Sequence, residues 1–219
     1  MKSTLLVTRP DYDVATGYLF YYAKEIIDFA EKKNIKVLDL VRPRLTRDGF
    51  SELVSKEDPG LLFFNAHGDD KTIYGDKIKG VEEPLIEEGK NHHLLNGRIT
   101  YARACCTAAS LGKACTGKEG CFIGYNAPFS FWFNEKWSAK PSNDNIAKMF
   151  LEPSNLIVLS LLKGNTALEA VDKSANMTNK SIMRLLRSKE ESGTMASMMI
   201  LWNNSQSLDI LGEKGIRFV

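Results

Sequence analysis

Residues 61–68 read Leu-Leu-Phe-Phe-Asn-Ala-His-Gly, and residues 99–107 read Ile-Thr-Tyr-Ala-Arg-Ala-Cys-Cys-Thr. Each stretch begins as an apolar run of strand length and ends on a reactive side chain, His67 in the first and Cys105 or Cys106 in the second. We interpret them as neighbouring parallel strands. In an open α/β sheet, reactive groups gather outside the carboxyl ends of the strands. The two stretches therefore predict a histidine base that faces a cysteine nucleophile.

Patterns on either side of these stretches predict an α/β fold with a largely parallel sheet covered on both faces. Further strand-like runs occupy residues 5–8, 36–41 and 120–125. Helical spacing of apolar residues covers residues 14–33, 46–54, 144–162, 166–187 and 193–211, and a further helix is expected to start at residue 107. Residues 72–76 suggest a small hairpin, and the polar stretch 82–95 suggests a helix. No linker or repeat interrupts the pattern, so a single domain over residues 1–219 is expected.

Composition excludes several classes of protein. A chain of 219 residues that is 43% hydrophobic can bury one large core. Its net charge of +2 comes from 29 basic and 27 acidic residues, which are dispersed, so direct nucleic-acid binding is not expected. The apolar run near the N-terminus is too short for a signal peptide, and none approaches the ~18 residues of a membrane span. We therefore expect a cytoplasmic protein without a membrane partner, whose four cysteines are reduced thiols.

A histidine beside a cysteine performs a specific chemistry. Thiolate is the nucleophile, and a free cysteine of pKa ~8.5 is only slightly ionised at neutral pH, so a nearby base is needed to take its proton. Gly68 leaves room for a substrate carbonyl, and the N–H groups of Gly68 and Cys105 could then point at the developing oxyanion. A helix that starts at Thr107 would further favour the thiolate with its positive end.

Simpler interpretations compete with this one. A lone His-Gly is more often a turn than a site, and a lone buried cysteine is usually a small core residue. Zinc binding is disfavoured, because the spacing of Cys105, Cys106, Cys115 and Cys121 does not form paired C-x-x-C knuckles. No metal and no cofactor is therefore expected. The arrangement of a histidine and then a cysteine at the ends of consecutive predicted strands favours a catalytic site over these simpler interpretations.

The motifs resemble those of a known family. Asn65-Ala66-His67-Gly68 and Ala104-Cys105-Cys106-Thr107-Ala108 are similar to the His-Gly and Ala-Cys-x-Thr-Ala motifs of the caspase-like clan CD cysteine peptidases, especially the CHAT-domain branch. Residues 161–171 and 196–212 resemble C-terminal segments of CHAT domains more weakly. The resemblance implies a caspase-like three-layer αβα sandwich with a mostly parallel central sheet.

The resemblance also implies roles for individual residues. His67 would be the general base, Cys105 the nucleophile, and the amides of Gly68 and Cys105 the oxyanion hole of a cysteine endopeptidase that cleaves protein or peptide substrates. Cys106 would point into the packing between sheet and helix. No third catalytic residue is evident, which agrees with the dyad usual in this clan.

Specificity is expected to depend on the residues around the nucleophile. Clan members often place a residue that contacts the substrate two positions before the cysteine, which here is Arg103; Asp69 and Ala104 are further candidates for substrate contact. A cation in the pocket would reject basic substrates and favour acidic ones. Acidic residues could neutralise it or line the pocket instead: Asp69, Asp70, Glu135 and Asp144. Alternatively, Arg103 points away and forms an ordinary ion pair.

Three functional interpretations stay open. The chain is an active endopeptidase, a non-catalytic caspase-like scaffold or protein-interaction module, or a latent enzyme that needs an activating partner protein, calcium or self-cleavage. Residues 136–144 and 188–193 are candidate loops for cleavage or docking. The aromatic stretch 128–137 could cover the core or line a substrate cleft, with the core favoured. Residues 215–219 could form an edge strand that pairs two copies.

Overall fold

The computed structural model describes residues 3–116, 119–187 and 194–218, and the candidate loop 188–193 and Val219 lie outside the described residues. Its strands are β1 Thr4–Thr8, β2 Lys36–Leu40, β3 Leu61–Asn65, β4 Thr72–Ile78, β5 Val81–Glu87, β6 Ile99–Arg103, β7 Cys121–Tyr125 and β8 Leu208–Gly212. Its α-helices are α1 Val14–Lys32, α2 Arg47–Glu57, α3 Leu111–Cys115, α4 Asn145–Leu162, α5 Ala167–Arg187 and α6 Thr194–Ser207. Short 3₁₀ helices cover η1 His92–Leu95, η2 Glu135–Trp137 and η3 Pro141–Asn143.

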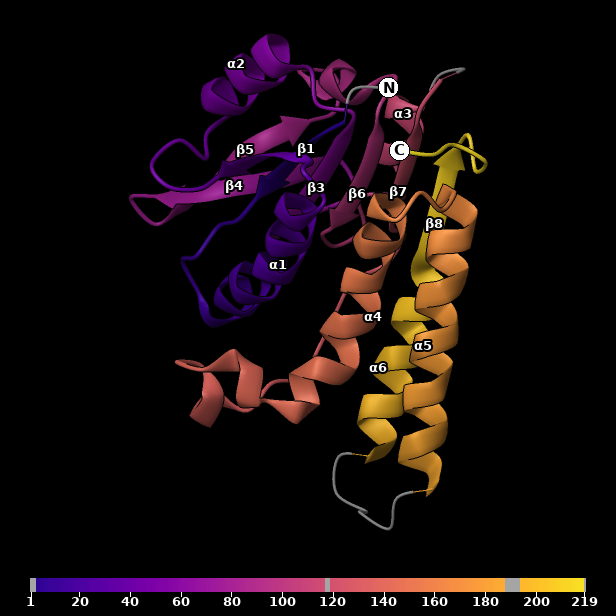
Figure 1. Ribbon diagram of the computed structural model, residues 1–219. Coiled ribbons are helices and arrows are strands. Elements are labelled where there is room, and N and C mark those ends of the chain that lie inside the picture. The colour runs from indigo at the N-terminus through magenta and orange to yellow at the C-terminus, as the bar shows by residue number, and fades with distance from the viewer. Residues whose placement is uncertain (1–2, 117–118, 188–193, 219) are drawn as a thin grey trace.

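A six-stranded sheet of order β2-β1-β3-β6-β7-β8 organises the molecule (Figure 1). All of its pairings are parallel except the last, in which β8 runs antiparallel to β7. The expected neighbours β3 and β6 pair in register from Leu61 opposite Ile99 to Asn65 opposite Arg103. Strands β4 and β5 form a separate antiparallel hairpin.

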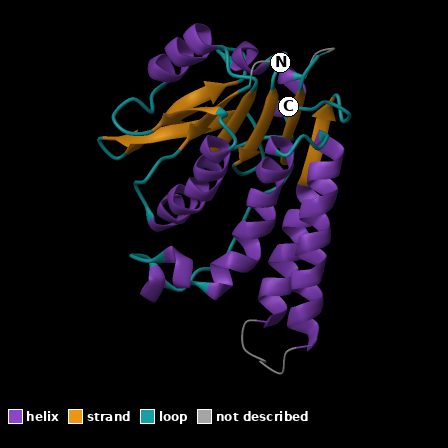
Figure 2. Ribbon diagram, viewed as in Figure 1, coloured by secondary structure: helices purple, strands orange, loops and turns teal. Residues whose placement is uncertain are grey.

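Two layers cover the sheet, as expected for strands buried on both faces (Figure 2). Alternate side chains of β3, Leu61 and Phe63, belong to a core shared with α1, α4 and α5. The intervening Leu62 and Phe64 belong to a second core shared with α2, α3 and the β4–β5 hairpin. The α5–α6 pair extends beyond the end of the sheet (Figure 1). The architecture is a three-layer αβα sandwich with a mostly parallel central sheet, as predicted.

Three local predictions are wrong. The stretch 82–95 is strand β5 followed by a 3₁₀ turn and not an α-helix, because its backbone pairs with β4. The helix expected from residue 107 begins only at Leu111, after a run of turns. The last helix ends at Ser207, where the chain turns into β8 and pairs with β7. Residues 208–212 therefore form the edge strand on this side of the sheet, whereas the described residues 215–218 form no strand of it.

No helix among the described residues combines the length and apolar character needed to cross a membrane.

Gly112 in α3 tests the packing of this short helix on the sheet. A Cβ there would lie 2.7 Å from Phe122 Cδ1 and 2.9 Å from Leu211 Cδ1, which is closer than carbon atoms pack. We expect Gly112→Ala to lower the free energy of unfolding by about 1–2 kcal/mol, although alanine favours helix. Gly215→Ala is the matched control, because a Cβ at that position would meet no atom within 4 Å. Urea denaturation measures both, and equal stability of the two variants would contradict the packing argument.

Candidate active site

Strands β3 and β6 bring His67 and Cys105 to the same edge of the sheet. Asn65 and Arg103 are the last paired residues, and the N–H of Ala66 still donates to the carbonyl of Arg103 at 3.3 Å. His67 and Cys105 each lie two residues beyond this pair. Neighbouring strands are about 4.8 Å apart. The sequence prediction that the two reactive residues follow adjacent parallel strands is confirmed.

Gly68 lets the two loops approach each other closely. A Cβ on Gly68 would lie 3.0 Å from Ala104 Cβ and 3.1 Å from Thr107 Cγ2, so a larger residue would push the loops apart. Within the described part of the chain, neither the N–H of Gly68 nor that of Cys105 donates a hydrogen bond. Two free amides near a reactive thiol are the donors that an oxyanion hole requires.

Asp13 holds His67, a partner that the sequence analysis missed. The carboxylate Oδ2 of Asp13 lies 2.8 Å from His67 Nε2, and both side chains are partly exposed. Because an ionised carboxylate only accepts, Nε2–H donates and Nδ1 is left as the proton acceptor. Burial acts to raise the pKa of Asp13, but hydrogen bonds from Thr16 and His67 outweigh it and lower that pKa. The hydrogen bond from His67 to Asp13 therefore orients the imidazole.

The position of Asp13 follows from the start of α1. Its side chain accepts from the N–H of Thr16 at 2.7 Å, and Thr16 Oγ1 accepts from the N–H of Asp13 at 3.0 Å, which makes a capping box. One carboxylate oxygen therefore caps the helix while the other binds His67. An aspartate directly before a helix and after a strand end was the available signal.

Tyr12, in the loop between β1 and α1, links the β4–β5 hairpin to this edge of the sheet. The Tyr12 ring lies 6.0 Å from the His67 ring, centroid to centroid, and its hydroxyl donates to Glu82 Oε1 at 2.9 Å. Burial, followed by Glu82, raises the pKa of Tyr12, so the phenol is neutral at physiological pH. Tyr12 thus forms an aromatic wall beside the histidine.

Cys105 is a half-buried thiol next to the aromatic stretch. Its Sγ donates to the carbonyl of Phe129 at 3.5 Å. Burial raises the pKa of Cys105, only partly opposed by that hydrogen bond. Phe129, Phe131 and Phe133 pack against the core, while Trp132 is 51% exposed. The preferred interpretation of this stretch as core is confirmed for the three phenylalanines.

Cys106 does not pack as predicted. It adopts a left-handed backbone conformation with φ of 60°, and its N–H donates to the carbonyl of Ala127 at 3.1 Å. Its side chain is partly exposed, and burial together with Asp70 and Asp69 raises the pKa of its thiol. Cys105, and not Cys106, packs against the core between sheet and helices. The helix expected to stabilise the thiolate begins six residues after Cys105, at Leu111, so it does not start beside the thiol.

Arg103 and Ala104 are not available to a substrate in this structure. Arg103 is fully buried and Ala104 is 1% exposed, whereas a pocket residue needs accessible surface. The guanidinium of Arg103 is buried and binds asparagine side chains, and among the described residues it forms no ion pair, so the alternative of an ordinary ion pair is not met either. The expectation of a pocket cation at this position is thereby corrected.

The acidic residues named from the sequence have separate places. Asp69 accepts hydrogen bonds from the N–H of Lys71 and the hydroxyl of Tyr74, both at 2.8 Å, which lower its pKa against the opposing effect of burial. Asp70 is exposed, and Glu135 is exposed in η2. Asp144 is buried and caps α4, so it is a structural residue.

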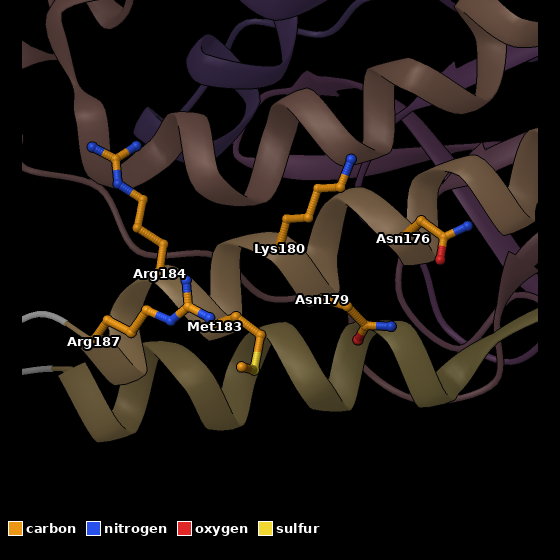
Figure 3. Close-up of a pocket in the computed structure, with 6 residues that line it drawn as sticks. All are labelled: Asn176, Asn179, Lys180, Met183, Arg184 and Arg187. Atoms are coloured by element: carbon orange, nitrogen blue, oxygen red, sulfur yellow. The ribbon is translucent and has the colours of Figure 1, made fainter.

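A hollow of about 840 Å³ lies elsewhere, on the surface of α5 (Figure 3). Its lining residues come from one helix: Asn176, Asn179, Lys180, Met183, Arg184 and Arg187. None of them belongs to the strand ends that carry His67 and Cys105, so this basic surface is distinct from the candidate site.

Comparison with known proteins identifies the fold. Neither the scan against protein-family models nor the search of curated proteins found a match. Among solved structures, the crystal structure of the Arg-specific cysteine proteinase gingipain R (RgpB) is similar, with a TM-score of 0.61 and 8% sequence identity over 98% of this chain. The chain corresponds to 47% of that protein, about half of its length. The fold is therefore the caspase-like fold seen in gingipain R.

Asp13 provides a test of this geometry through stability. We expect Asp13→Ala to lower the free energy of unfolding by about 0.5–2 kcal/mol at pH 7, since the cap of α1 is lost, and Asp13→Asn to cost less, since asparagine also caps. The pKa of Asp13 is lowered in the folded state, so its contribution is present above the unfolded value near ~3.9 and is lost as pH falls through the folded pKa. Denaturation from pH 2 to 7 measures this, and a pH dependence unchanged in Asp13→Asn would contradict it.

Proposed function

We propose that this chain is a cysteine endopeptidase with Cys105 as nucleophile and His67 as general base. The observation that carries the proposal is the parallel pairing of β3 and β6, after which both residues follow at equal distance from the last pair, Asn65 opposite Arg103. The motifs around these residues resemble those of clan CD, especially its CHAT branch, and the caspase-like fold is consistent with that clan. The proposed chemistry requires no metal and no cofactor.

In the proposed reaction, His67 Nδ1 takes the proton of Cys105, and the thiolate attacks the substrate carbonyl carbon. The C–N bond breaks, the protonated imidazole gives its proton to the leaving amine, and an acyl-enzyme thioester forms. Water then loses a proton to His67 and attacks the thioester, the C–S bond breaks and releases the carboxylic acid product, and the imidazolium returns its proton to the Cys105 thiolate. The free amides of Gly68 and Cys105 support an oxyanion hole for both steps. Asp13 orients the imidazole throughout and adds a third member to the dyad expected from the sequence.

Substrates with a basic residue before the cleaved bond fit this site better than acidic ones. Arg103, the reason to expect an acidic preference, is buried, whereas Asp13, Asp69 and Asp70 place negative charge near the strand ends. Like charges repel, so an acidic substrate side chain would bind poorly there. The Arg-specific activity of gingipain R is consistent with this preference.

The proposed setting is the cytoplasm, with protein or peptide substrates and an activating partner protein, and without direct contact with nucleic acid or membrane. We include an activating partner because burial raises the pKa of Cys105, whereas a thiol ready for catalysis has a lowered pKa. The same observation favours the second candidate, a non-catalytic caspase-like interaction module.

Single substitutions separate these functions. We expect Cys105→Ala to abolish cleavage of fluorogenic peptides and His67→Ala to lower kcat by about 10²–10⁴-fold, because the base is lost. Cys106→Ala is the matched control and should retain activity. If no peptide is cleaved and iodoacetamide labels Cys105 no faster than the buried Cys115, the endopeptidase proposal fails and the interaction module is favoured.

A peptide panel varied at the residue before the cleaved bond tests specificity. Peptides with Arg or Lys should show a kcat/KM about tenfold or more above those with Asp or Glu, a difference of ~1.4 kcal/mol in binding of the transition state. Asp70→Asn should reduce this difference in kcat/KM between the basic and the acidic peptides. An acidic preference would contradict the charge argument.

A further inference from the structure

Arg103 is a buried cation that forms no ion pair with any carboxylate of the described residues. It is 0% exposed and among the largest fully buried side chains. Among the ion pairs of the described residues, none includes Arg103. Burial lowers its pKa, yet a guanidinium stays protonated in proteins. An apolar side chain would fill this volume without the desolvation cost, so the guanidinium needs an explanation beyond packing.

The guanidinium instead binds two asparagine side chains. Its Nε donates to Asn65 Oδ1 at 3.0 Å, its Nη2 donates to the same oxygen, and its Nη1 donates to Asn155 Oδ1 at 2.9 Å. The group lies 5.1 Å from the centre of the Phe63 ring. The planar fork of an arginine can reach both acceptors at once, which a lysine ammonium on a flexible stem cannot reproduce.

Asn65 extends this contact to a third strand. Its Nδ2 donates to the carbonyl of Thr8 at 3.1 Å, and its N–H donates to Thr8 Oγ1 at 3.3 Å. Asn65 thereby joins the carboxyl ends of β1, β3 and β6. Asp13 follows Thr8 by five residues, while His67 and Cys105 follow Asn65 and Arg103 by two residues each.

Asn155 of α4 ties the same group to the helix that Asp13 caps. Its Nδ2 donates to the carbonyl of Tyr22 and to Glu25 Oε2, both at 2.9 Å and both in α1. Asn155 thus bridges Glu25 and Arg103, so the carboxylate of Glu25 is linked to the cation through one amide. Every segment that carries a member of the candidate site is therefore connected to one guanidinium.

We propose that Arg103 is a positioning residue, which clamps Asn65 and Asn155 and thereby sets the separation of His67 from Cys105. The inference rests on the proposed function, since it assumes that His67 activates Cys105. Arg103 touches no substrate in this role. It acts through the two strand ends, where a displacement of about 1 Å is enough to change reactivity up to 10²-fold.

The experiment measures the alkylation of Cys105 by iodoacetamide in the full chain, in a Cys106→Ala background so that adjacent thiols are not confused. In this parent, His67→Ala should slow labelling about tenfold or more, because the base is removed. Arg103→Lys keeps the positive charge but loses the planar fork of donors, and should slow labelling about tenfold. Adding His67→Ala to Arg103→Lys should then have little further effect on the labelling rate. Val158→Ala, a buried α4 position outside the clamp, is the matched control and should change the rate less than about twofold at a comparable loss of stability.

The outcomes separate the two proposals. If His67→Ala leaves labelling unchanged in the parent, the dyad fails and the positioning role fails with it. If the parent depends on His67, but Arg103→Lys labels at the parent rate with the same dependence, the dyad stands and only the clamp is overturned. If circular dichroism shows that Arg103→Lys is unfolded, Asn65→Ala replaces it, with the same expected loss and the same overturning result. Where both variants fold, their combination should lose no more than either alone, and additive losses would contradict a single clamp.

Discussion

The register of β3 against β6 is the constraint on which the rest of the structure depends. Both strands are buried on both faces, so Phe63 and Phe64 each belong to a different core. A slip of one residue would exchange the faces of every side chain in a strand, which neither core could accommodate. The register therefore holds Asn65 opposite Arg103, and the chain beyond this pair delivers a histidine and a cysteine to one edge.

The same strand ends mark where apolar burial gives way to polar burial. Up to Phe64 and Ala102 the paired side chains are apolar except for the hydroxyl groups of Thr100 and Tyr101, whereas the next pair is an amide and a guanidinium. Polar groups in such a place must satisfy one another, because water does not reach them. Each interaction is directional, unlike the packing of Leu61 on its neighbours, so the polar layer restricts the geometry of the loops more sharply than the apolar layer beneath it.

Elements that depend on the local sequence pattern could be predicted, whereas elements that depend on pairing with residues far away in the sequence could not. Short apolar runs predict the buried strands, and the helical spacing of apolar residues predicts the long helices. Strand β8 could not be separated from α6, because its apolar residues also fit helical spacing, and only the pairing of Ile210 opposite Ile123 makes it a strand. The same holds for stretch 82–95, whose strand depends on pairing with β4.

The candidate site divides in the same way. His67 and Cys105 each follow an apolar run of strand length, and this was enough to predict that they share an edge of the sheet, because the carboxyl ends of parallel strands lie at the same edge. Asp13 was missed because its partner His67 is 54 residues away and the aspartate is fully explained locally as a helix cap. The partners of Arg103 could not be predicted, because its acceptors Asn65 and Asn155 are 38 and 52 residues away.

Burial and the hydrogen bond to Phe129 act on the thiol of Cys105 in opposite directions, and the effect of burial is the larger. Burial raises its pKa, and the carbonyl of Phe129 accepts its proton in a hydrogen bond. In the proposed reaction, an imidazolium at His67 would attract the thiolate of Cys105. That attraction is about 4 kcal/mol at 4 Å with an effective dielectric constant of 20, and falls to about 1.7 kcal/mol at 10 Å. The strength of this attraction therefore depends on the separation of two side chains that follow neighbouring strands, which makes the rigidity of the strand ends as important to the proposed chemistry as the two reactive groups themselves.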